Sequence, residues 1–522
     1  MSARLLHPDE YELGSRSSVD SDGTFNLDDD DFESQIPPTS RLGARRRPWF
    51  ARLFPFAFSG YRRLKTNSRP ILVSSARPTC ARRFSFRRRC CNLHIVFGVV
   101  LALVLFASIF TPSYTHPPAH YSTLRKSALE KNSAGRGNPH NEKVFIAASL
   151  YDRGGDLARG QWGTQLLQLV DLLGSHNVFV SIYENDSGEE GQAALRELEQ
   201  QIPSPKRIVF EEHLDLKTIP SITIPGGETR IKRIEYLAEL RNKALQPLND
   251  QPDTRYDKLL YLNDILFEPV DALQLLFSTN VNGDGRSQYR AACAVDFDNP
   301  FKFYDTYATR DLQGYSMGLP FFPWFSTAGS HESRKDVLQG KDAVRVRSCW
   351  GGMVAFDAKF FQDPLPTGTT PARFRSGTDL FWEASECCLI HADIQDPQTR
   401  VDEITDTGIY MNPYVRVAYD RRTLSWLGIT RRWEKLYSPI HNIGNHLVGL
   451  PWYNPRRTEA PGQSVQETVW IPDSSQDGGG SFQTVDRTAG NDGYCGRRGL
   501  QVIVENRKPG QKGYEPIPVP SI

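Results

Sequence analysis

The run KLLYLNDILF at residues 258–267 decides the fold class of this chain. Its first half is apolar without alternation, which is typical of a strand buried on both faces of a parallel sheet. Asn263 and Asp264 interrupt the run before apolar residues return. Because open α/β sheets bind ligands at the carboxyl ends of their strands, we expect Asn263 and Asp264 to lie at a ligand site.

Strand-like and helix-like segments alternate in front of this run. The expected strands are residues 143–150, 177–183 and 207–210, and the expected helices are residues 161–173, 188–201 and 230–245. Such alternation predicts right-handed βαβ units in a doubly wound, mostly parallel α/β sheet. After about residue 268 the pattern loosens into short strands and aromatic- and glycine-rich loops, which we expect to shape an acceptor cleft.

The N-terminal part predicts a tail and a membrane anchor. Residues 1–91 are rich in serine, proline and charge, which predicts a disordered cytosolic tail with a basic second half. No folded basic motif accompanies it, so the sequence does not favour nucleic-acid binding. Residues 92–112 contain an uncharged apolar run and are expected to form one transmembrane helix. The basic side precedes this run, which predicts a single-pass type II protein with a lumenal remainder.

The lumenal part is expected to divide into three sections. These are a stem at residues 113–140, the main domain at 141–445, and a C-terminal extension at 446–522 with a flexible linker. Five cysteines follow the apolar run, at positions 293, 349, 387, 388 and 495. A lumenal setting permits disulfides, and the odd number leaves at least one cysteine free or paired between chains.

Asp264 is the best single candidate for a metal ligand. A nucleoside diphosphate carries several negative charges, and a hard divalent cation held by one or two carboxylates neutralises them. Asn263 would bind ribose or sugar hydroxyls. An Asx turn that simply ends the strand is the alternative explanation for both residues.

Three further residues are candidates for donor contacts. Glu184 and Asn185 end the second expected strand, on the same sheet edge as Asp264, where base or ribose contacts are expected. Arg241, in the helix expected at 230–245, would reach a phosphate or a sugar. An unpaired arginine on a helix surface is the alternative.

Residues 382–393, WEASECCLIHAD, bring Glu386 and His391 close in sequence. Residues five positions apart on a continuous helix do not lie on one face. A helix that ends near Glu386 and is followed by a strand would let both side chains point into one cleft. Glu386 would then assist at the reacting sugar and His391 would be a metal ligand. A buried structural histidine is the alternative. Asp296 and Asp305 add polar groups, with surface ion pairing as their alternative.

Several ordered segments together resemble the fungal α-1,3-mannosyltransferase family of the cryptococcal capsule-associated type. The matching segments are VFVSIYENDS (178–187), YLA (236–238) with LRN (240–242), LND (262–264), ACA (292–294) with DF (296–297), YDT (304–306), RD (310–311), CWGG (349–352), ASECCLI (384–390), NPYVR (412–416) and GYCG (493–496). The resemblance covers about residues 143–440 and the late GYCG element.

The resemblance implies a GT-A-like fold, type II Golgi topology, GDP-mannose as donor and a divalent cation, with Mn²⁺ expected. It further implies transfer with retention to a mannose hydroxyl of a glycan. Asp264 would hold the metal with His391, Arg241 and Asn263 would position the donor, and Glu386 would stabilise positive charge at the sugar, as nucleophile or as electrostatic support.

Two alternatives remain open at this point. One is a transferase that uses another nucleotide sugar, and the other is a non-catalytic lumenal subunit of a capsule or cell-wall glycan assembly complex. A scaffold needs none of Asp264, Glu386 and His391, and the chain has all three, which favours the enzyme.

Overall fold

The computed structural model describes residues 82–520 except 131, 252, 322–323, 363–369, 398–402, 474–478 and 506–511. Of the described residues, 82–99 fall in one compact unit and 100–520 in another. Most of the predicted disordered tail, residues 1–81, lies outside the described residues, and residues 82–91 form the start of a helix.

Helix α1, Arg82–Phe110, contains the apolar run that was expected to span a membrane. Within the described part of the chain, no helix is both long enough and apolar enough to cross a bilayer. The expected transmembrane helix at residues 92–112 thus finds no support in α1. Its apolar run, residues 95–110, is shorter than the about 20 apolar residues that a span needs.

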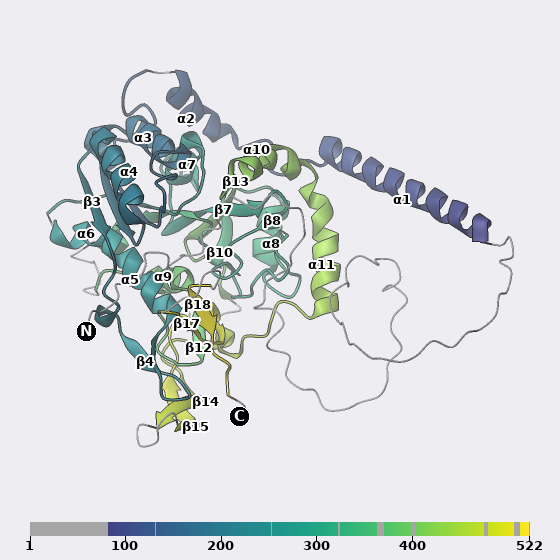
Figure 1. The fold of residues 1–522 in the computed structure, drawn as a ribbon. Helices are drawn as coiled ribbons and strands as arrows, with labels where there is room; N and C mark the ends of the chain where they lie inside the picture. Colours follow the sequence, from purple (N-terminus) through teal and green to yellow (C-terminus); the bar gives the residue numbers. More distant parts are fainter. Residues whose placement is uncertain are drawn as a thin grey trace, which may run out of the picture. The chain divides into compact units, whose positions relative to one another are not determined.

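A ten-stranded sheet forms the centre of the larger unit (Figure 1). Its strands, in spatial order, are β3 (Lys206–Glu211), β2 (Val178–Asn185), β1 (Val144–Leu150), β6 (Lys258–Leu262), β11 (Met353–Asp357), β7 (Ala291–Asn299), β13 (Ile409–Ala418), β10 (Val344–Ser348) and β9 (Arg310–Asp311), with β8 (Lys302–Phe303) paired to β7. Strands β3, β2, β1 and β6 are parallel, and β11 runs antiparallel between β6 and β7. The predicted mixed α/β architecture with a largely parallel sheet is confirmed.

The order of the first four strands creates a switch point between β1 and β6. The chain passes from β1 outward to β2 and β3, and then returns to the other side of β1 with β6. Crevices at such points, beyond the carboxyl ends of the strands, are where open α/β sheets bind ligands. Asp152 follows β1 at this place, and Asn263 and Asp264 follow β6.

Both faces of the sheet are buried, which explains the apolar runs without alternation. Along β1, Val144, Ile146 and Ala148 belong to one core, and Phe145 and Ala147 belong to the other. The first core is shared with helices α3 (Gln161–Leu173), α4 (Gly188–Gln201) and α7 (Pro269–Ser278), and the second with α5 (Arg233–Leu245) and α9 (Glu386–Ile394). Successive strand residues point to opposite faces, so both sets must be apolar.

The segment expected as a stem is part of the domain. Residues Ala119–Glu130 form helix α2, which buries Tyr121, Leu124 and Ala128 at helical spacing. The Tyr121 hydroxyl accepts a hydrogen bond from Asn412 Nδ2 at 2.7 Å, and Gln274 Nε2 donates to the Tyr121 carbonyl at 3.0 Å. The stem prediction is wrong because this buried helical face was not recognised.

The C-terminal extension is largely structured. Strands β14 (Ser464–Asp473) and β15 (Gly479–Thr488) pair as a hairpin where a flexible linker was expected, and the ring centroids of Trp470 and Phe482 lie 5.3 Å apart across it. Such aromatic pairs stabilise a hairpin whose glycine and serine content suggests a linker. Further on, β16 (Gly496–Arg498) pairs with β12 (Trp382–Ala384), and β17 (Gln501–Ile503) pairs with β18 (Tyr514–Pro516).

Two disulfides use four of the five cysteines that follow the apolar run. They join Cys293 to Cys349 and Cys388 to Cys495, and Cys387 is a buried free thiol. The second disulfide joins α9 to the C-terminal extension. The leftover thiol agrees with the odd count in the sequence.

A fully buried ion pair allows a direct test of this packing. Arg416 in β13 pairs with both carboxylate oxygens of Glu434, which lies in the 3₁₀ helix η6 (Arg431–Leu436). We expect Glu434→Gln to lower the free energy of unfolding by about 3 kcal/mol, because the Arg416 charge would stay buried without its counter-ion. Urea unfolding measures this change. Glu190→Gln, in an exposed pair with Arg159, is the control, and an equal loss in both variants would contradict the prediction.

Candidate active site

Three of the predicted site residues meet through one guanidinium group. Arg241 lies on α5, Asn263 follows β6, and Glu386 is the first residue of α9. Arg241 Nε donates to Glu386 Oε1 at 3.0 Å, and Arg241 Nη1 donates to Asn263 Oδ1 at 3.2 Å. The fold therefore brings together residues that are far apart in the sequence, and Arg241 is not an unpaired surface arginine.

Hydrogen bonds fix both the side chain and the backbone of Asn263. Trp350 Nε1 and Arg241 share its Oδ1, at 3.3 Å for the indole, while Trp162 Nε1 donates to its carbonyl at 2.9 Å. Its backbone N–H donates to the carbonyl of Gly352 at 2.9 Å. Gly352 has a φ of +66°, and a Cβ there would lie 2.7 Å from Ile265, so glycine is required at this approach. These contacts, rather than an Asx turn, account for the position of the Asn263 side chain.

Asp264 is half-buried at the same strand end. Burial raises the pKa of Asp264 and Asp152 adds to that effect, while its own backbone amide and Arg241 oppose it. Within the described part of the chain, its carboxylate bonds to its own backbone amide and to no other side chain. A partially exposed carboxylate that is held only by its own backbone is suited to bind a ligand.

Two more carboxylates belong to this site. Asp296 Oδ1 accepts from the Asp305 amide at 3.1 Å, and Asp296 Oδ2 accepts from the Tyr419 hydroxyl at 3.0 Å. Burial raises the pKa of Tyr304 to about 12, and Asp296, Asp264 and Asp305 add to that effect. The three carboxylates thus act on the same phenol. Surface ion pairing, the alternative for Asp296 and Asp305, is wrong because both take part in this partly buried network.

The cluster is strongly acidic and has Arg241 as its nearby cation. Burial raises the pKa of Asp305, with Glu386 adding to the effect and Arg241 opposing it. Asp305 Oδ2 also accepts from the Gly351 amide at 3.3 Å. Burial and neighbouring carboxylates disfavour the ionised forms of Asp296 and Asp305, and a bound cation would favour them.

His391 lies in the core and not with Asp264. Its Nδ1 bonds to the Cys387 carbonyl at 2.7 Å, and its Nε2 lies 3.8 Å from Cys293 Sγ. Burial lowers the pKa of His391 to about 4, so the ring is neutral. The assignment of His391 as a metal ligand beside Asp264 is not supported. Helix α9 starts at Glu386, capped by Ser385, so Glu386 and His391 lie on one continuous helix and point in different directions.

The surroundings of His391 do not form another metal site. The ligand atoms of Cys293, Cys349 and His391 lie within 4.8 Å of one another, but the two sulfurs are bonded to each other. A disulfide offers no thiolate to a metal. His391 is the buried structural histidine that the sequence left as the alternative.

Glu184 is fully buried beside the switch point. Neither of its carboxylate oxygens has a hydrogen-bond partner within the described part of the chain. Burial raises its pKa to about 7, with Ser187 opposing and Asp152 adding to the effect. Asn185 is also buried, and its Nδ2 donates to the Tyr236 hydroxyl at 3.1 Å. Glu184 is thus a buried carboxyl without a hydrogen-bond partner at the end of β2, whereas the Asn185 side chain is used within the fold.

Asp152 is a site residue that the sequence reasoning missed. It stands two positions after β1, as Asp264 stands two positions after β6. Its carboxylate accepts from the amides of Leu157 at 2.9 Å and Ala158 at 2.8 Å, which shapes the loop after β1. The signal that identified Asp264, a polar residue just beyond a buried strand, would have found it.

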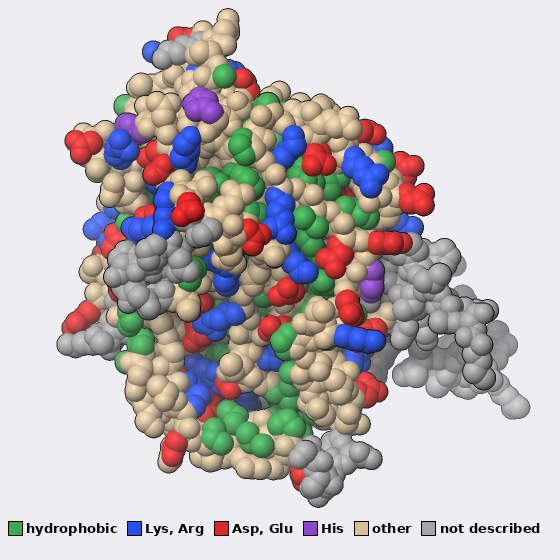
Figure 2. Space-filling view, turned by 90° about the vertical axis from the view of Figure 1, so that its left-hand side faces the viewer, with side chains coloured by type: hydrophobic (Ala, Val, Ile, Leu, Met, Phe, Trp, Pro, Cys, Tyr) green, Lys and Arg blue, Asp and Glu red, His purple; other side chains and the backbone are tan. Residues whose placement is uncertain are grey.

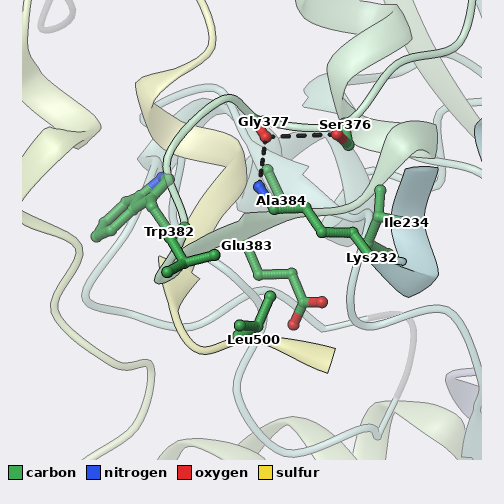
Figure 3. Close-up of a pocket in the computed structure, with 9 residues that line it drawn as sticks. Lys232, Ile234, Ser376, Gly377, Trp382, Glu383, Ala384 and Leu500 are labelled. Atoms are coloured by element: carbon green, nitrogen blue, oxygen red, sulfur yellow. Dashed lines mark hydrogen bonds between the residues drawn. The ribbon is translucent and has the colours of Figure 1, made fainter. Parts of the chain in front are cut away.

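A small pocket lies elsewhere, between α5 and β12 (Figure 3). Lys232 enters it and donates to the carbonyls of Gly377 and Asp379, both at 2.8 Å. Glu383 lines it as well, and burial raises the pKa of Glu383 to about 6. None of the predicted site residues lines this pocket, and its lysine is already bound, so we do not place the donor there.

Comparison with known proteins agrees with the resemblance. Residues 143–393 match the model of the family described as Cryptococcal mannosyltransferase 1. The chain is therefore similar to that family over residues 143–393. Alpha-1,3-mannosyltransferase CMT1 of Cryptococcus neoformans var. neoformans serotype D is 27% identical over 249 residues, which is 44% of this chain and 49% of that protein. The chain thus spans about half the length of the curated relative that it matches.

The likeness to solved structures is distant. Mannosyltransferase PcManGT from Pyrobaculum calidifontis, solved in complex with GDP-Man and Mn²⁺, aligns with 69% of this chain and 78% of its own, at 12% identity and a TM-score of 0.30. S. aureus TarS 1–349 aligns with 52% of this chain and 60% of its own, at 9% identity and a TM-score of 0.26. Asp264, Arg241, Asn263 and Glu386 all fall inside the residues that match the family model.

The buried Glu184 predicts a specific pH dependence. Its carboxyl ionises near pH 4.5 when unfolded and near 7 when folded, so between these values the folded state holds a proton that the unfolded state has lost. The free energy of unfolding should therefore fall as pH rises through this window, by about 3 kcal/mol more than in Glu184→Gln. Urea unfolding at several pH values measures the difference. Glu189→Gln, at an exposed site, should keep the wild-type pH dependence, and the same slope in Glu184→Gln would refute the assignment.

Proposed function

We propose that this protein is a retaining α-1,3-mannosyltransferase that moves mannose from GDP-mannose to a mannose-containing glycan. The observation that carries the proposal is the placement of Asp264 just after β6, at the switch point of the sheet and within the residues that match the mannosyltransferase family model. A doubly wound sheet with a nucleotide site at this crevice is also consistent with a GT-A-like fold.

The carboxylates suit a divalent cation such as Mn²⁺. Asp264 has no other side chain bound to it within the described part of the chain, and Asp296 and Asp305 add negative charge nearby. Oxygen ligands of this kind are the ones that hard cations prefer. When bound, the cation would neutralise the charge of the GDP pyrophosphate, and Asp264 is the residue that would hold it.

Arg241 and Glu386 have separate tasks in this scheme. Arg241 is fixed by Glu386 and Asn263 and lies 4.5 Å from the Trp350 ring centroid, so its position is set before the donor arrives. A fixed guanidinium is suited to position a phosphate. Glu386 is almost fully buried and stabilises the positive charge that develops at the sugar carbon, as electrostatic support.

In this scheme mannose passes directly from the donor to the acceptor, without a covalent enzyme intermediate. The bond between mannose C1 and the phosphate oxygen breaks, and a bond from C1 to the acceptor hydroxyl oxygen forms on the same face of the sugar. The hydroxyl proton passes to the departing phosphate oxygen. Glu386 Oε1 accepts from Arg241 during this step and is not consumed as a nucleophile.

The two disulfides support an oxidising compartment, and we propose that the protein works in the Golgi lumen. Cys293–Cys349 and Cys388–Cys495 both stabilise the domain around α9. Such bonds form and persist in the secretory pathway and are rare in the cytosol.

Asp264→Asn tests the metal-binding role. We expect Mn²⁺-dependent transfer of mannose from GDP-mannose to a short mannoside, and a fall in kcat/KM of about 100-fold or more in Asp264→Asn, because a neutral amide holds a hard cation weakly. The assay follows labelled product with Mn²⁺ and with a chelator. Asp284→Asn, in an exposed turn, carries the same change and should match the wild type. Transfer that survives Asp264→Asn would refute the metal role of Asp264.

A panel of nucleotide sugars tests the donor. Turnover with GDP-mannose and not with UDP- or other GDP-sugars supports the proposal, and the anomeric configuration of the product, read by NMR, reports retention. Turnover with a different donor alone would make the protein another nucleotide-sugar transferase. No turnover with any donor would favour a non-catalytic subunit of a glycan assembly complex.

A further inference from the structure

Helix α11, Tyr437–Val448, directs polar side chains toward the domain and apolar side chains toward solvent. Its buried side is polar: His441 Nε2 bonds to the Met317 carbonyl at 2.9 Å, and Asn445 Oδ1 accepts from the Leu319 amide at 2.8 Å. A surface helix of a globular protein normally directs its apolar stripe to the core. Here the inward stripe makes hydrogen bonds, and the apolar stripe is left outside.

The outward side of α11 is apolar and strongly exposed. Ile440, Ile443 and Leu447 follow helical spacing on one face and are 58%, 63% and 77% exposed. Trp452 and Tyr453, after the helix, are also exposed, and so are Trp426 and Ile429 on α10 (Arg421–Thr430). We call the exposed apolar residues of 421–453 the apolar face. Figure 1 shows α10 and α11 next to each other, and η6 joins them.

Basic residues outnumber acidic ones along this segment, and Asp420, the N-cap of α10, lies directly before it. Residues 421–453 contain five basic residues, Arg421, Arg422, Arg431, Arg432 and Lys435, and Glu434 as the sole acidic one. Glu434 is buried and neutralised by Arg416, so the exposed charge of the segment is positive. On the face of the molecule shown in Figure 2, by contrast, basic and acidic side chains are interspersed.

We propose that the apolar face docks the domain on the surface of an anionic lipid bilayer. Aliphatic side chains, Trp and Tyr with neighbouring Arg and Lys are the composition by which helices lie in a membrane interface. Indole and phenol rings prefer the headgroup level, and guanidinium groups bind lipid phosphates. The contact is peripheral: α11 lies along the surface of the bilayer.

Charge complementarity favours a lipid surface over a second copy of this chain. In a two-fold self-interface the same patch meets itself, which would bring Arg421, Arg422 and Arg432 of one copy near those of the other. Like charges facing each other oppose association. Anionic headgroups instead neutralise them. The proposal does not depend on the transferase activity, because none of these residues belongs to the active site.

Vesicle binding by the full chain tests the proposal. We expect binding to phosphatidylcholine vesicles to increase when phosphatidylserine is included, and to weaken with salt. Ile443→Glu with Leu447→Glu should reduce binding about tenfold or more. The matched control is Leu338→Glu with Ile471→Glu, which places the same charges at exposed apolar residues of α8 (His331–Leu338) and β14 and should bind as the wild type.

A second pair of substitutions isolates the electrostatic part. Arg421→Gln with Arg422→Gln should weaken binding to phosphatidylserine-containing vesicles by about fivefold for each guanidinium removed, and leave binding to phosphatidylcholine alone unchanged. Near-UV circular dichroism confirms that each variant is folded. Because α1 is intact in every variant, any binding that it contributes is common to all of them.

Two results would overturn the proposal. The first is unchanged vesicle binding in the Ile443/Leu447 variant, or an equal loss in the Leu338/Ile471 control. The second is a change in oligomeric state by light scattering in the Ile443/Leu447 variant with unchanged vesicle binding, which would assign the face to a second copy.

Discussion

The burial of one guanidinium group organises the site. Arg241 comes from α5 and is enclosed by the aromatic rings of Trp350, Tyr261 and Phe374. A charge in such a place is tolerated only when it is paired and hydrogen-bonded. Glu386 supplies the pairing and Asn263 a second acceptor. The requirement to satisfy Arg241 therefore fixes the start of α9 against the end of β6, where Asp264 emerges.

The acidic side of the site depends on the same pairing. Arg241 lowers the pKa of Asp264 and of Asp305, whereas burial and neighbouring carboxylates raise both. Arg241 does not fully offset these effects, because Glu386 already takes part of its charge. An arrangement of this kind is costly in the empty protein and favourable once a cation is present. Binding sites commonly carry such uncompensated charge.

The parts of the site that could be predicted are those set by local pattern. A polar residue that ends a doubly buried strand must lie at the sheet edge, which identified Asp264 and Asn263 and would have identified Asp152. The pairing of Arg241 with Glu386 could not be read, because it joins residues 145 positions apart. The metal-ligand prediction for His391 found no support for a local reason. Ser385 caps α9, so the helix starts at Glu386 and runs through His391 into the core.

The sequence by itself determined the alternation of strands and helices, the doubly buried runs and the place of Asp264, because strand and helix periods and burial act over a few residues. Only the tertiary structure decided that β6 returns beside β1, that His391 faces a disulfide, and that α11 turns its polar side inward. The period of α11 is visible in the sequence, but its direction depends on the carbonyl of Met317 and the amide of Leu319, more than 100 residues away. Asp264 gains its acidic neighbours in the same way, since β7 and the loop after it reach the sheet edge only once the sheet is assembled.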